Sequence, residues 1–591
     1  MSDQARRAGL HVWCTLALAL ALAACGGGGG SGDSGGSGNV AAGNGANGGG
    51  NGGTGSSNSD VMFSSKQDAQ RFLEQATFGA TTASLAELQS GSANQWLTKQ
   101  FGIASTGYSG FFYVNPSTQG SCATDASIVA QSTDPLMLKN CSRDYYGLTQ
   151  VQRKFFVNAI NGPDQLRQRV AFALSQLFVT SGYEAYAQAD YQNMLLNDAF
   201  GNFRDLMRDV TLHPVMGSWL NMVNNGKPNA AKGIQANENY ARELMQLFTI
   251  GLEKLNADGS VQTDSNGDAV PTYGQAEITA MARAMTGWTF PPLPGATSKW
   301  TNPTNRAGKM VAFDTQHDVD VKVLLDGKTL PAGQTAQQDL DGALDIIFNH
   351  PNVGPFVGKQ LIQKLVTSNP SPAYVARVSA AFDNNGSGVR GDLKAVIKAI
   401  LLDPEARGGN VADAGYGHLR EPALFIASLL RTLGANSDGM APRSAVAGMS
   451  QNIYASPSVF NFYSPQYRAP GAADLYGPEF GILDTSSALA RMNAVGAYVL
   501  QTNGVGADSS VTGSIGTRID FASWVPITDP DQLVNQMAAV LLHDDLPADA
   551  HATIVAQVKA LTAKAIAANP QLPARTVAYL IATSPLYEVQ R

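Results

Sequence analysis

The sequence predicts an all-α protein, with a large multi-helical body over residues 60–591 and one small β-hairpin insert. Apolar residues recur at three- and four-residue spacing through most of this stretch, which is the period of one face of an α-helix. Alternation of apolar and polar residues, the pattern of a half-buried strand, is rare and is clearest at 259–272. The hydrophobic fraction of 44% and the charged fraction of 15% are normal for a globular chain with a sizeable core. We expect one body, with a division into two lobes near residues 330–340 as the alternative.

Residues 1–24 have the pattern of a bacterial lipoprotein signal peptide. Arg6 and Arg7 give a positive start, and a segment rich in Leu and Ala runs over 12–24. This segment is too short for a membrane-spanning helix, which needs about 20 apolar residues. Its end, Leu-Ala-Ala followed by Cys25, resembles the lipobox, so we expect cleavage before Cys25 and lipidation of that cysteine. A cleaved leader with a chance cysteine is the alternative.

Residues 25–59 are expected to be the lipidated cysteine followed by a disordered tether. Beyond Cys25 this stretch is almost entirely Gly, Ser, Asn and Ala, which cannot bury enough apolar surface to become ordered. A flexible coil of this length spans roughly 30–35 Å. We therefore expect an extracytoplasmic body that is lipid-anchored at the outer membrane or cell surface and faces the periplasm or the exterior.

The helices expected along the body follow from the same spacing. In 166–178 the apolar residues fall on one face of a helix. In 393–401 the apolar face is preceded by Asp392, a good N-cap, and followed by Pro404, which stops a helix. The other helices are expected at 69–75, 85–101, 237–251, 277–285, 340–348, 357–365, 423–433, 487–500, 530–542 and 550–567.

The hairpin is expected from two turn dipeptides, Asp-Gly at 258–259 and Asn-Gly at 266–267, which flank short segments of mixed polarity. Asp264, Asn266 and Asp268 lie in this insert, and their alternate spacing resembles the start of a calcium-binding loop. Gly267, however, falls at the fourth position counted from Asp264, whereas an EF-hand loop needs its glycine at the sixth. We therefore expect a plain hairpin and no metal site.

Composition and motifs argue against several classes of protein. The formal net charge of −7 argues against a nucleic-acid-binding protein, which usually has a basic face. The sequence contains no His-Glu-x-x-His helix, no Cys-x-x-Cys pair, no Walker phosphate loop and no Gly-x-Ser-x-Gly elbow in the body. Zinc proteases, common ATPases and ordinary α/β esterases are therefore disfavoured.

Cys122 and Cys141 are the two cysteines of the body, and both lie in polar stretches that are typical of loops. An even pair in an oxidising compartment favours a disulfide. Two free thiols are the alternative.

The segment 237–251 carries the densest set of polar groups on a helix that is otherwise apolar. Tyr240 belongs to its apolar arc, and Gly251 is a natural C-cap. The polar arc contains two i,i+4 pairs, which are Glu238 with Arg242 and Asn239 with Glu243. These side chains can serve as acid–base groups and as an anion-binding guanidinium, or they can form an ordinary solvated face.

His317 and Asp318 form the second candidate, with Lys322 nearby in a loop rich in polar residues. A histidine beside a carboxylate can act as a general base or a metal ligand. The alternative is a purely structural pair.

Several of these segments together resemble the bacterial domain-of-unknown-function 1800 (DUF 1800) family, and the similarity covers about residues 62–591. The resemblance rests on 237–251 and on four further segments, namely Arg71-Phe72-Leu73 with Ala76 to Thr81, Ala282 to Trp288, His317-Asp318 with Lys322, and Ser584 to Tyr587 with Arg591. One departure is Ala276, where the family more often has an acidic residue. The resemblance implies a mainly helical, extracytoplasmic protein and no particular reaction. It also implies a partner, an exported protein resembling alkaline phosphatases and sulfatases.

Two functions are compatible with these features. The first is a non-catalytic binding or assembly lipoprotein. The second is a surface-anchored hydrolase acting on an extracellular polymer or conjugate, in which Glu238, Arg242, Glu243, His317 and Asp318 are catalytic and Asn239, Tyr240, Trp288 and Lys322 bind. The sequence names no cofactor, and it leaves enzymatic activity open.

Overall fold

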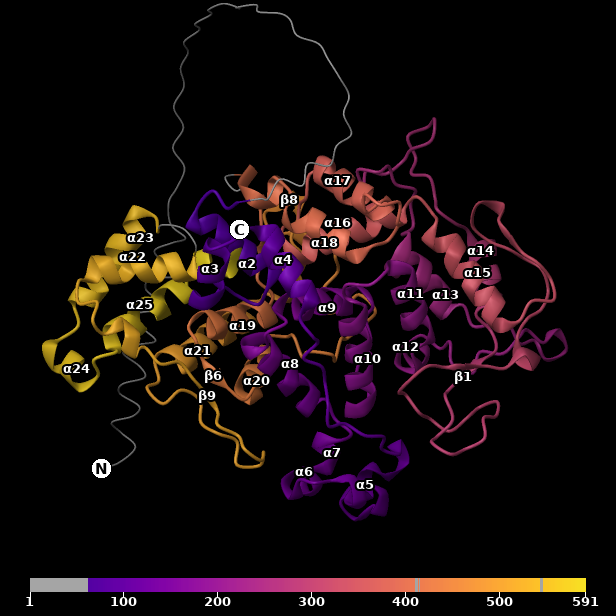
Figure 1. Ribbon diagram of the computed structural model, residues 1–591, viewed down its shortest axis with the longest axis horizontal. Helices are drawn as coiled ribbons and strands as arrows, with labels where there is room; N and C mark the ends of the chain where they lie inside the picture. Colours follow the sequence, from indigo (N-terminus) through magenta and orange to yellow (C-terminus); the bar gives the residue numbers. More distant parts are fainter. Residues whose placement is uncertain (1–61, 410–412, 414, 543–545) are drawn as a thin grey trace, which may run out of the picture. The chain divides into compact units, whose positions relative to one another are not determined.

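Helices make up most of the chain, and five pairs of short antiparallel strands accompany them in the described residues (Figure 1). The computed structural model describes residues 62–409, 413, 415–542 and 546–591, which belong to one compact unit. The predicted signal peptide, Cys25 and the tether lie outside the described residues. The predicted mainly helical fold with a small β insert is confirmed, and the division into two lobes stays a prediction.

Between residues 62 and 290 the chain contains a succession of short helices. They are α2 (Lys66–Ala76), α3 (Thr82–Gln89), α4 (Ala93–Gly102), α5 (Ala126–Gln131), α6 (Pro135–Lys139), α7 (Cys141–Asp144), α8 (Thr149–Asn161), α9 (Gln165–Leu177), α10 (Ala185–Asp198), α11 (Phe203–Leu212), α12 (Pro214–Trp219), α13 (Asn239–Glu243) and α14 (Gln275–Ala284).

The remaining α-helices run to the end of the chain. They are α15 (Ala336–Phe348), α16 (Val353–Leu365), α17 (Pro372–Asp383), α18 (Leu393–Leu401), α19 (Pro422–Thr432), α20 (Met440–Gly448), α21 (Thr485–Val499), α22 (Pro530–Leu541), α23 (Ala548–Lys559), α24 (Ala563–Ala568), α25 (Leu572–Ala582) and α26 (Pro585–Glu588).

The strands pair antiparallel and are two to five residues long. The pairs are β1 (Trp288–Thr289) with β2 (Val311–Ala312), β3 (Lys322–Val323) with β4 (Thr329–Leu330), β5 (His418–Leu419) with β10 (Val589–Gln590), β6 (Asn436–Ser437) with β9 (Thr517–Arg518), and β7 (Arg468–Ala469) with β8 (Ala472–Tyr476).

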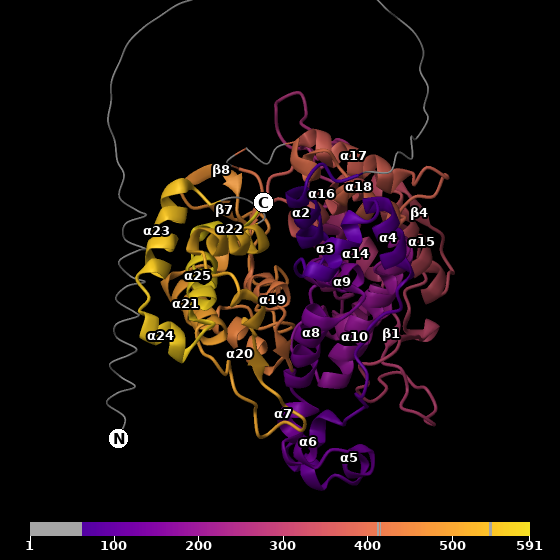
Figure 2. The ribbon, with the colours of Figure 1, turned by 60° about the vertical axis from the view of Figure 1, so that its left-hand side comes forward.

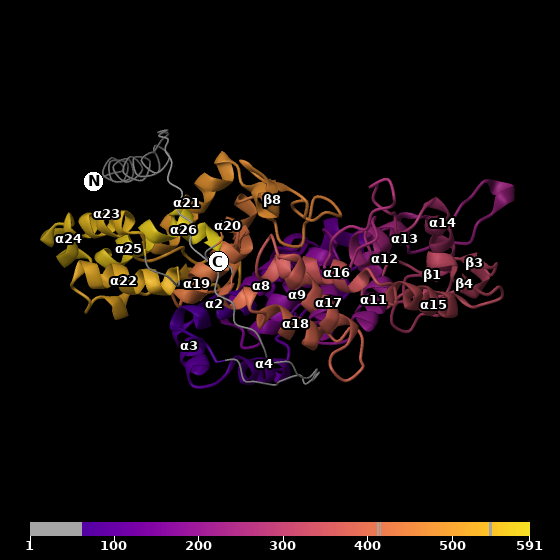
Figure 3. The ribbon, with the colours of Figure 1, turned by 90° about the horizontal axis from the view of Figure 1, so that it is seen from above.

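Helices that pack on one another come from both near and distant parts of the chain. In the first half, α8, α9 and α10 contact one another (Figure 2), and α9 also contacts α16. The helices α16, α17 and α18 form a further packed group (Figure 3). Near the C-terminus α22, α23 and α25 pack together. Among the described helices, none combines the length and the apolar character that crossing a bilayer requires.

Local capping decides where several helices begin. Asp392 caps α18 as predicted, because its carboxylate accepts hydrogen bonds from the backbone of Lys394 and Ala395. The single helix expected at 85–101 is wrong. Ser92 and Gln95 cap one another's backbone and start a new helix, so the segment forms α3 and α4.

The predicted hairpin is part of a slightly larger insert. Isolated bridges join Thr263 to Ala269, as expected, and a third segment adds the bridges Leu255 to Val261 and Glu253 to Pro271. The turn at Gly267 closes when its backbone N–H donates to the Asp264 carbonyl, 3.1 Å away. The insert therefore has three short segments in place of two.

The helix expected at 237–251 starts as α13 and then widens into a π-helical turn at Leu244–Thr249. The Thr249 hydroxyl donates to the Leu244 carbonyl at 2.6 Å inside this turn. Gly251 ends it at φ 73°, and a Cβ there would lie 2.8 Å from the Phe356 ring, so this position needs glycine. Single π turns inside α-helices often occur at functional sites.

Cys122 and Cys141 form the predicted disulfide, which joins residues 19 positions apart. It ties α7 to the 3₁₀ segment Pro116–Thr124. Replacing both cysteines by serine is expected to lower the free energy of unfolding by about 2–3 kcal/mol, because the open loop regains conformational entropy in the unfolded chain. Urea unfolding of the oxidised protein and the double variant measures this loss. Equal unfolding midpoints would contradict it.

Candidate functional site

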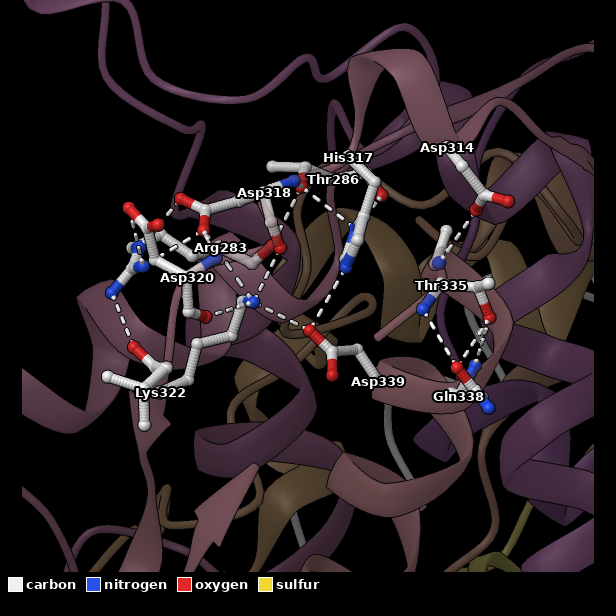
Figure 4. A network of polar contacts seen from close by, with 12 residues as sticks. Arg283, Thr286, Asp314, His317, Asp318, Asp320, Lys322, Thr335, Gln338 and Asp339 are labelled. Atoms are coloured by element: carbon white, nitrogen blue, oxygen red, sulfur yellow. Dashed lines mark hydrogen bonds and ion pairs between the residues drawn. The ribbon is translucent and has the colours of Figure 1, made fainter. Parts of the chain in front are cut away.

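His317 and Lys322, two of the predicted site residues, meet at a carboxylate that the prediction did not include (Figure 4). His317 Nε2 lies 3.0 Å from Oδ2 of Asp339, in the first turn of α15, and Lys322 Nζ lies 2.6 Å from the same oxygen. His317 Nδ1 lies 2.9 Å from the backbone carbonyl of Thr286. The Thr286 hydroxyl, which donates to the Arg283 carbonyl, lies 3.2 Å from the same nitrogen, so both ring nitrogens of His317 contact polar protein groups.

Asp318 is held from the other side by Arg283, which lies on α14. The guanidinium donates to both carboxylate oxygens, at 2.7 and 2.9 Å. Lys322 Nζ is 3.6 Å from Asp318 and donates to the Asp318 and Asp320 carbonyls. Burial raises the pKa of Asp318, but the Arg283 hydrogen bonds and the charges of Arg283 and Lys322 outweigh it, so the net pKa lies below the ordinary value.

We call Arg283, His317, Asp318, Lys322 and Asp339 the His317 cluster. Asp320 lies at the edge of this cluster, with its carboxylate 3.9 Å from Arg283 and its side chain 86% exposed. The side chains of His317, Lys322 and Asp339 are 0% exposed, and Asp318 is 7% exposed. The centre of the cluster is therefore closed to solvent, while Arg283, 23% exposed, lies at its edge. The buried Lys322 contacts two carboxylates, as a buried charge must to avoid a large desolvation cost.

Glu238 belongs to a second, more open group at the start of α13. Its carboxylate accepts hydrogen bonds from Gln275 at 2.9 Å, from Thr279 at 2.7 Å and from Arg242 at 3.2 Å. The predicted Glu238–Arg242 pair is therefore confirmed, with side chains 29% and 40% exposed. We call Glu238, Arg242, Gln275 and Thr279 the Glu238 group.

Electrostatics in the Glu238 group favour an ionised carboxylate. Partial burial raises the pKa of Glu238, but the hydrogen bonds from Thr279 and Gln275 and the charge of Arg242 bring it below its ordinary value. Burial acts in the opposite sense on Glu243 and raises its pKa, although Arg242 lowers it in part. The two carboxylates of this helix therefore differ in their affinity for a proton.

One face of α14 links the two groups. Gln275, Thr279 and Arg283 are spaced by four residues, so they lie in successive turns of the helix, about 6 Å apart along its axis. The first two contact Glu238 and the third contacts Asp318. The structure thus brings the two predicted halves of the site to one helix face.

The other predicted residues lie apart from this face or inside the core. Asn239 and Glu243 are half-buried, and no hydrogen bond joins them in the described part of the chain. The Tyr240 ring is buried, and its hydroxyl donates to Thr211 at 2.7 Å. Trp288 is buried in β1, and its indole Nε1 has no partner among the described residues. Tyr240 and Trp288 therefore act here as packing residues.

Sequence reasoning missed Asp339 and did not assign a role to Arg283. The buried face of α15 contains Ala336, Leu340 and Ala343, and Asp339 falls within this apolar stripe. A carboxylate on a buried helix face requires a cationic partner. This pattern could have predicted that Asp339 has a buried partner. It does not identify Lys322 and His317 as the residues that contact it.

The chain is thus a mainly helical protein in which a largely buried ionic cluster and a partly exposed polar group share one face of α14. The family model described as "Protein of unknown function (DUF1800)" matches residues 71–589, so the chain belongs to that family. The comparisons with curated proteins and with solved structures find no match. The resemblance predicted from the sequence is confirmed, whereas its lipoprotein part stays a prediction.

Proposed function

We propose that the protein is an extracytoplasmic lipoprotein, anchored through Cys25, that acts as a binding or assembly component. The observation that supports this proposal is the burial of the His317 cluster. A general base must come within hydrogen-bond reach of the proton that it removes. The His317 ring and its Asp339 partner are 0% exposed and are bonded to each other, which suits a structural role.

A lipid anchor at Cys25 and an exported partner protein are also part of the proposed function. Lipidation of Cys25 would hold the protein at the outer membrane or cell surface. The partner that we propose is an exported protein resembling alkaline phosphatases and sulfatases. The formal charge of −7 supports our view that nucleic acid is not a ligand.

A surface-anchored hydrolase is the second candidate, and the Glu238 group is the observation that favours it. Glu238 is ionised and partly exposed, whereas burial raises the pKa of Glu243 on the same helix. Carboxylates whose environments move their pKa values apart can divide the roles of base and acid. Arg242 would orient an anionic or carboxylate group beside them.

Product release distinguishes the two candidates. The full-length, lipid-modified protein, purified in detergent, is incubated with extracellular polysaccharides, peptidoglycan and simple phosphate and sulfate esters. We expect no more product from the wild-type protein than from the Glu243→Gln variant. A wild-type rate that falls by about a hundredfold or more in Glu243→Gln, as for loss of an acid–base group, would overturn the binding role.

Labelling with a radioactive fatty acid tests the anchor. We expect the label on the wild-type protein and none on the Cys25→Ser variant, which has no thiol to acylate. The Cys14→Ser variant is the matched control, because Cys14 lies within the predicted leader and is removed with it. Unchanged labelling of Cys25→Ser would refute lipidation at this residue.

A further inference from the structure

Arg169, on α9, is a fully buried cation that meets no carboxylate directly. Its guanidinium donates from Nη2 to the backbone carbonyl of Lys364 at 2.5 Å. Its Nε and Nη1 have no hydrogen-bond partner among the described residues. A buried charge is unfavourable unless an opposite charge or several hydrogen bonds offset it. The N–H groups at Nε and Nη1 are therefore suited to an anionic partner.

Lys364 and His418 lie beside this guanidinium. Lys364 Nζ is 3.4 Å from the Tyr463 hydroxyl, and it forms no ion pair with a carboxylate of the described residues. His418, on β5, is 4% exposed, and neither ring nitrogen has a hydrogen-bond partner in the described part of the chain. Burial, together with the nearby charges of Arg169 and Lys364, lowers the pKa of His418 to about 3. We call Arg169, Lys364 and His418 the Arg169 site.

The two nearest carboxyl groups do not neutralise these cations by contact. Glu421 is buried and accepts hydrogen bonds from three uncharged donors, which are Gln176 at 2.9 Å, Tyr463 at 2.9 Å and Gln451. Burial raises the pKa of Glu479 to about 7, so this group is largely protonated at mildly acidic pH. Positive charge is therefore in excess around the Arg169 site below this pH.

The segment 462–476, which contains β7 and β8 and which we call the strap, lies over the site (Figure 2). Tyr463 is the only buried residue within it. Apart from a bond to the adjoining Gly477, the strap hydrogen-bonds to the rest of the described chain at two residues. These are the Tyr463 hydroxyl and the backbone of Tyr476, which exchanges two bonds with Asn369. The strap is therefore held at its two ends.

Tyr463 closes the site at one of these ends. Its hydroxyl lies 2.9 Å from Glu421 and 3.1 Å from the amide oxygen of Gln176. Its ring covers the Lys364 ammonium, with Nζ 4.5 Å from the ring centre. Movement of the Tyr463 side chain would therefore expose this ammonium and make room beside it.

We propose that the Arg169 site binds an oxyanion, such as the carboxylate, sulfate or phosphate group of a ligand, and that the strap admits it when Tyr463 moves away. Hydrogen bonds from a guanidinium or ammonium to an oxyanion are about twice as strong as neutral ones. The neutral His418 ring adds one further N–H donor. A metal ion is disfavoured, because Arg169 and Lys364 repel it. The site goes beyond the proposed function, since neither candidate function uses these residues.

Thermal unfolding of the full-length protein tests this site at pH 6, below the pKa of Glu479. Chloride is replaced stepwise by phosphate, sulfate or acetate at constant ionic strength. We expect at least one oxyanion to raise the Tm to a plateau, from which an apparent Kd follows. A general salt effect on stability would instead grow steadily with concentration.

Three variants locate the binding. Lys364→Met should weaken it about tenfold or more, as for one lost hydrogen bond from a charged group. Lys398→Met is the matched control, because Lys398 is also half-buried and also lies over an aromatic ring, that of Phe101 at 6.0 Å. It should leave the apparent Kd within about twofold of wild type. Tyr463→Phe keeps the ring but removes the hydroxyl that holds the strap, so it should tighten binding about fivefold.

Hydrogen exchange of the strap amides gives a second measurement. We expect the oxyanion that binds to speed exchange in 462–476 of the wild-type protein, and Tyr463→Phe to speed it without any added oxyanion. The site is refuted if no oxyanion gives a plateau, or if Lys364→Met and Lys398→Met weaken binding equally. Weaker binding in Tyr463→Phe, or exchange in the strap that no oxyanion changes, would refute entry beneath Tyr463.

Discussion

Replacing Asp339 by asparagine is expected to lower the free energy of unfolding by about 3–5 kcal/mol. Asp339 is the carboxylate that His317 and Lys322 share, at 3.0 and 2.6 Å, and all three side chains are fully buried. Asparagine keeps the size of the side chain but removes its negative charge. The Lys322 ammonium then stays in the interior with Asp318, 3.6 Å away, as its remaining carboxylate.

Urea unfolding followed by tryptophan fluorescence measures this loss, and an exposed pair supplies the control. Asp531 and Lys559 are 3.2 Å apart, with side chains 52% and 59% exposed. Asp531→Asn makes the same chemical change and should cost less than about 1 kcal/mol, because water solvates both partners. Equal losses for the two variants would show that burial of the His317 cluster contributes nothing.

The helices were predictable because their signals are local. The apolar spacing of 393–401 and the cap at Asp392 depend on residues within one or two turns, and α18 forms where they predict it. The insert was predictable for the same reason, since its turns have Gly259 and Gly267 at positive φ. The break at Ser92 was missed although its capping box is also local, because apolar spacing alone does not register it.

The site was only half predictable. His317, Asp318 and Lys322 are neighbours in sequence, so their proximity could be expected. Their partners come from elsewhere, since Asp339 lies on α15 and Arg283 on α14. Which carboxylate meets which cation depends on how α14, α15 and β3 pack, and no spacing in the sequence specifies that packing.

The buried hydrogen-bond network around Glu421 had no sequence signal at all. Gln176 and Gln451 are brought to one carboxylate, Glu421, from helices and loops that are far apart in the chain. Glutamine carries no charge and usually lies at the surface, so these residues give no indication in the sequence that they are buried together. The positive φ of Tyr454 follows from its surroundings and cannot be predicted from its residue type.

Glu479 is a buried acid, and its ionised form is unfavourable in the folded protein. It is 2% exposed, and its Oε1 lies 3.8 Å from His418 Nδ1. Burial raises its pKa to about 7, helped by the charge of Glu421, while Lys364 and Arg169 only partly oppose the rise. Burial and the charges of Arg169 and Lys364 lower the pKa of His418 to about 3, so the imidazole beside Glu479 is neutral.

Glu479→Gln is therefore expected to stabilise the protein at high pH. The pKa of Glu479 is higher in the folded chain, about 7, than its ordinary 4.5. The stability it contributes is complete below pH 4.5 and is lost as the pH rises through 7, a loss on the order of 3 kcal/mol by pH 8. Glutamine never ionises, so the variant should match the wild type at pH 4.5 and exceed it by that amount at pH 8.

Urea unfolding of both proteins between pH 4.5 and 8 measures the difference, from which the contribution of His418, present in both, cancels. Glu238→Gln is the control of opposite sign, because the pKa of Glu238 is lowered in the folded chain. The contribution of Glu238 to the free energy of unfolding is present above pH 4.5 and is lost as the pH falls. The Glu238→Gln variant should therefore be less stable than the wild type at pH 8. If Glu479→Gln instead loses stability at pH 8, the ionised carboxylate pairs productively with Lys364, and burial does not dominate at this position.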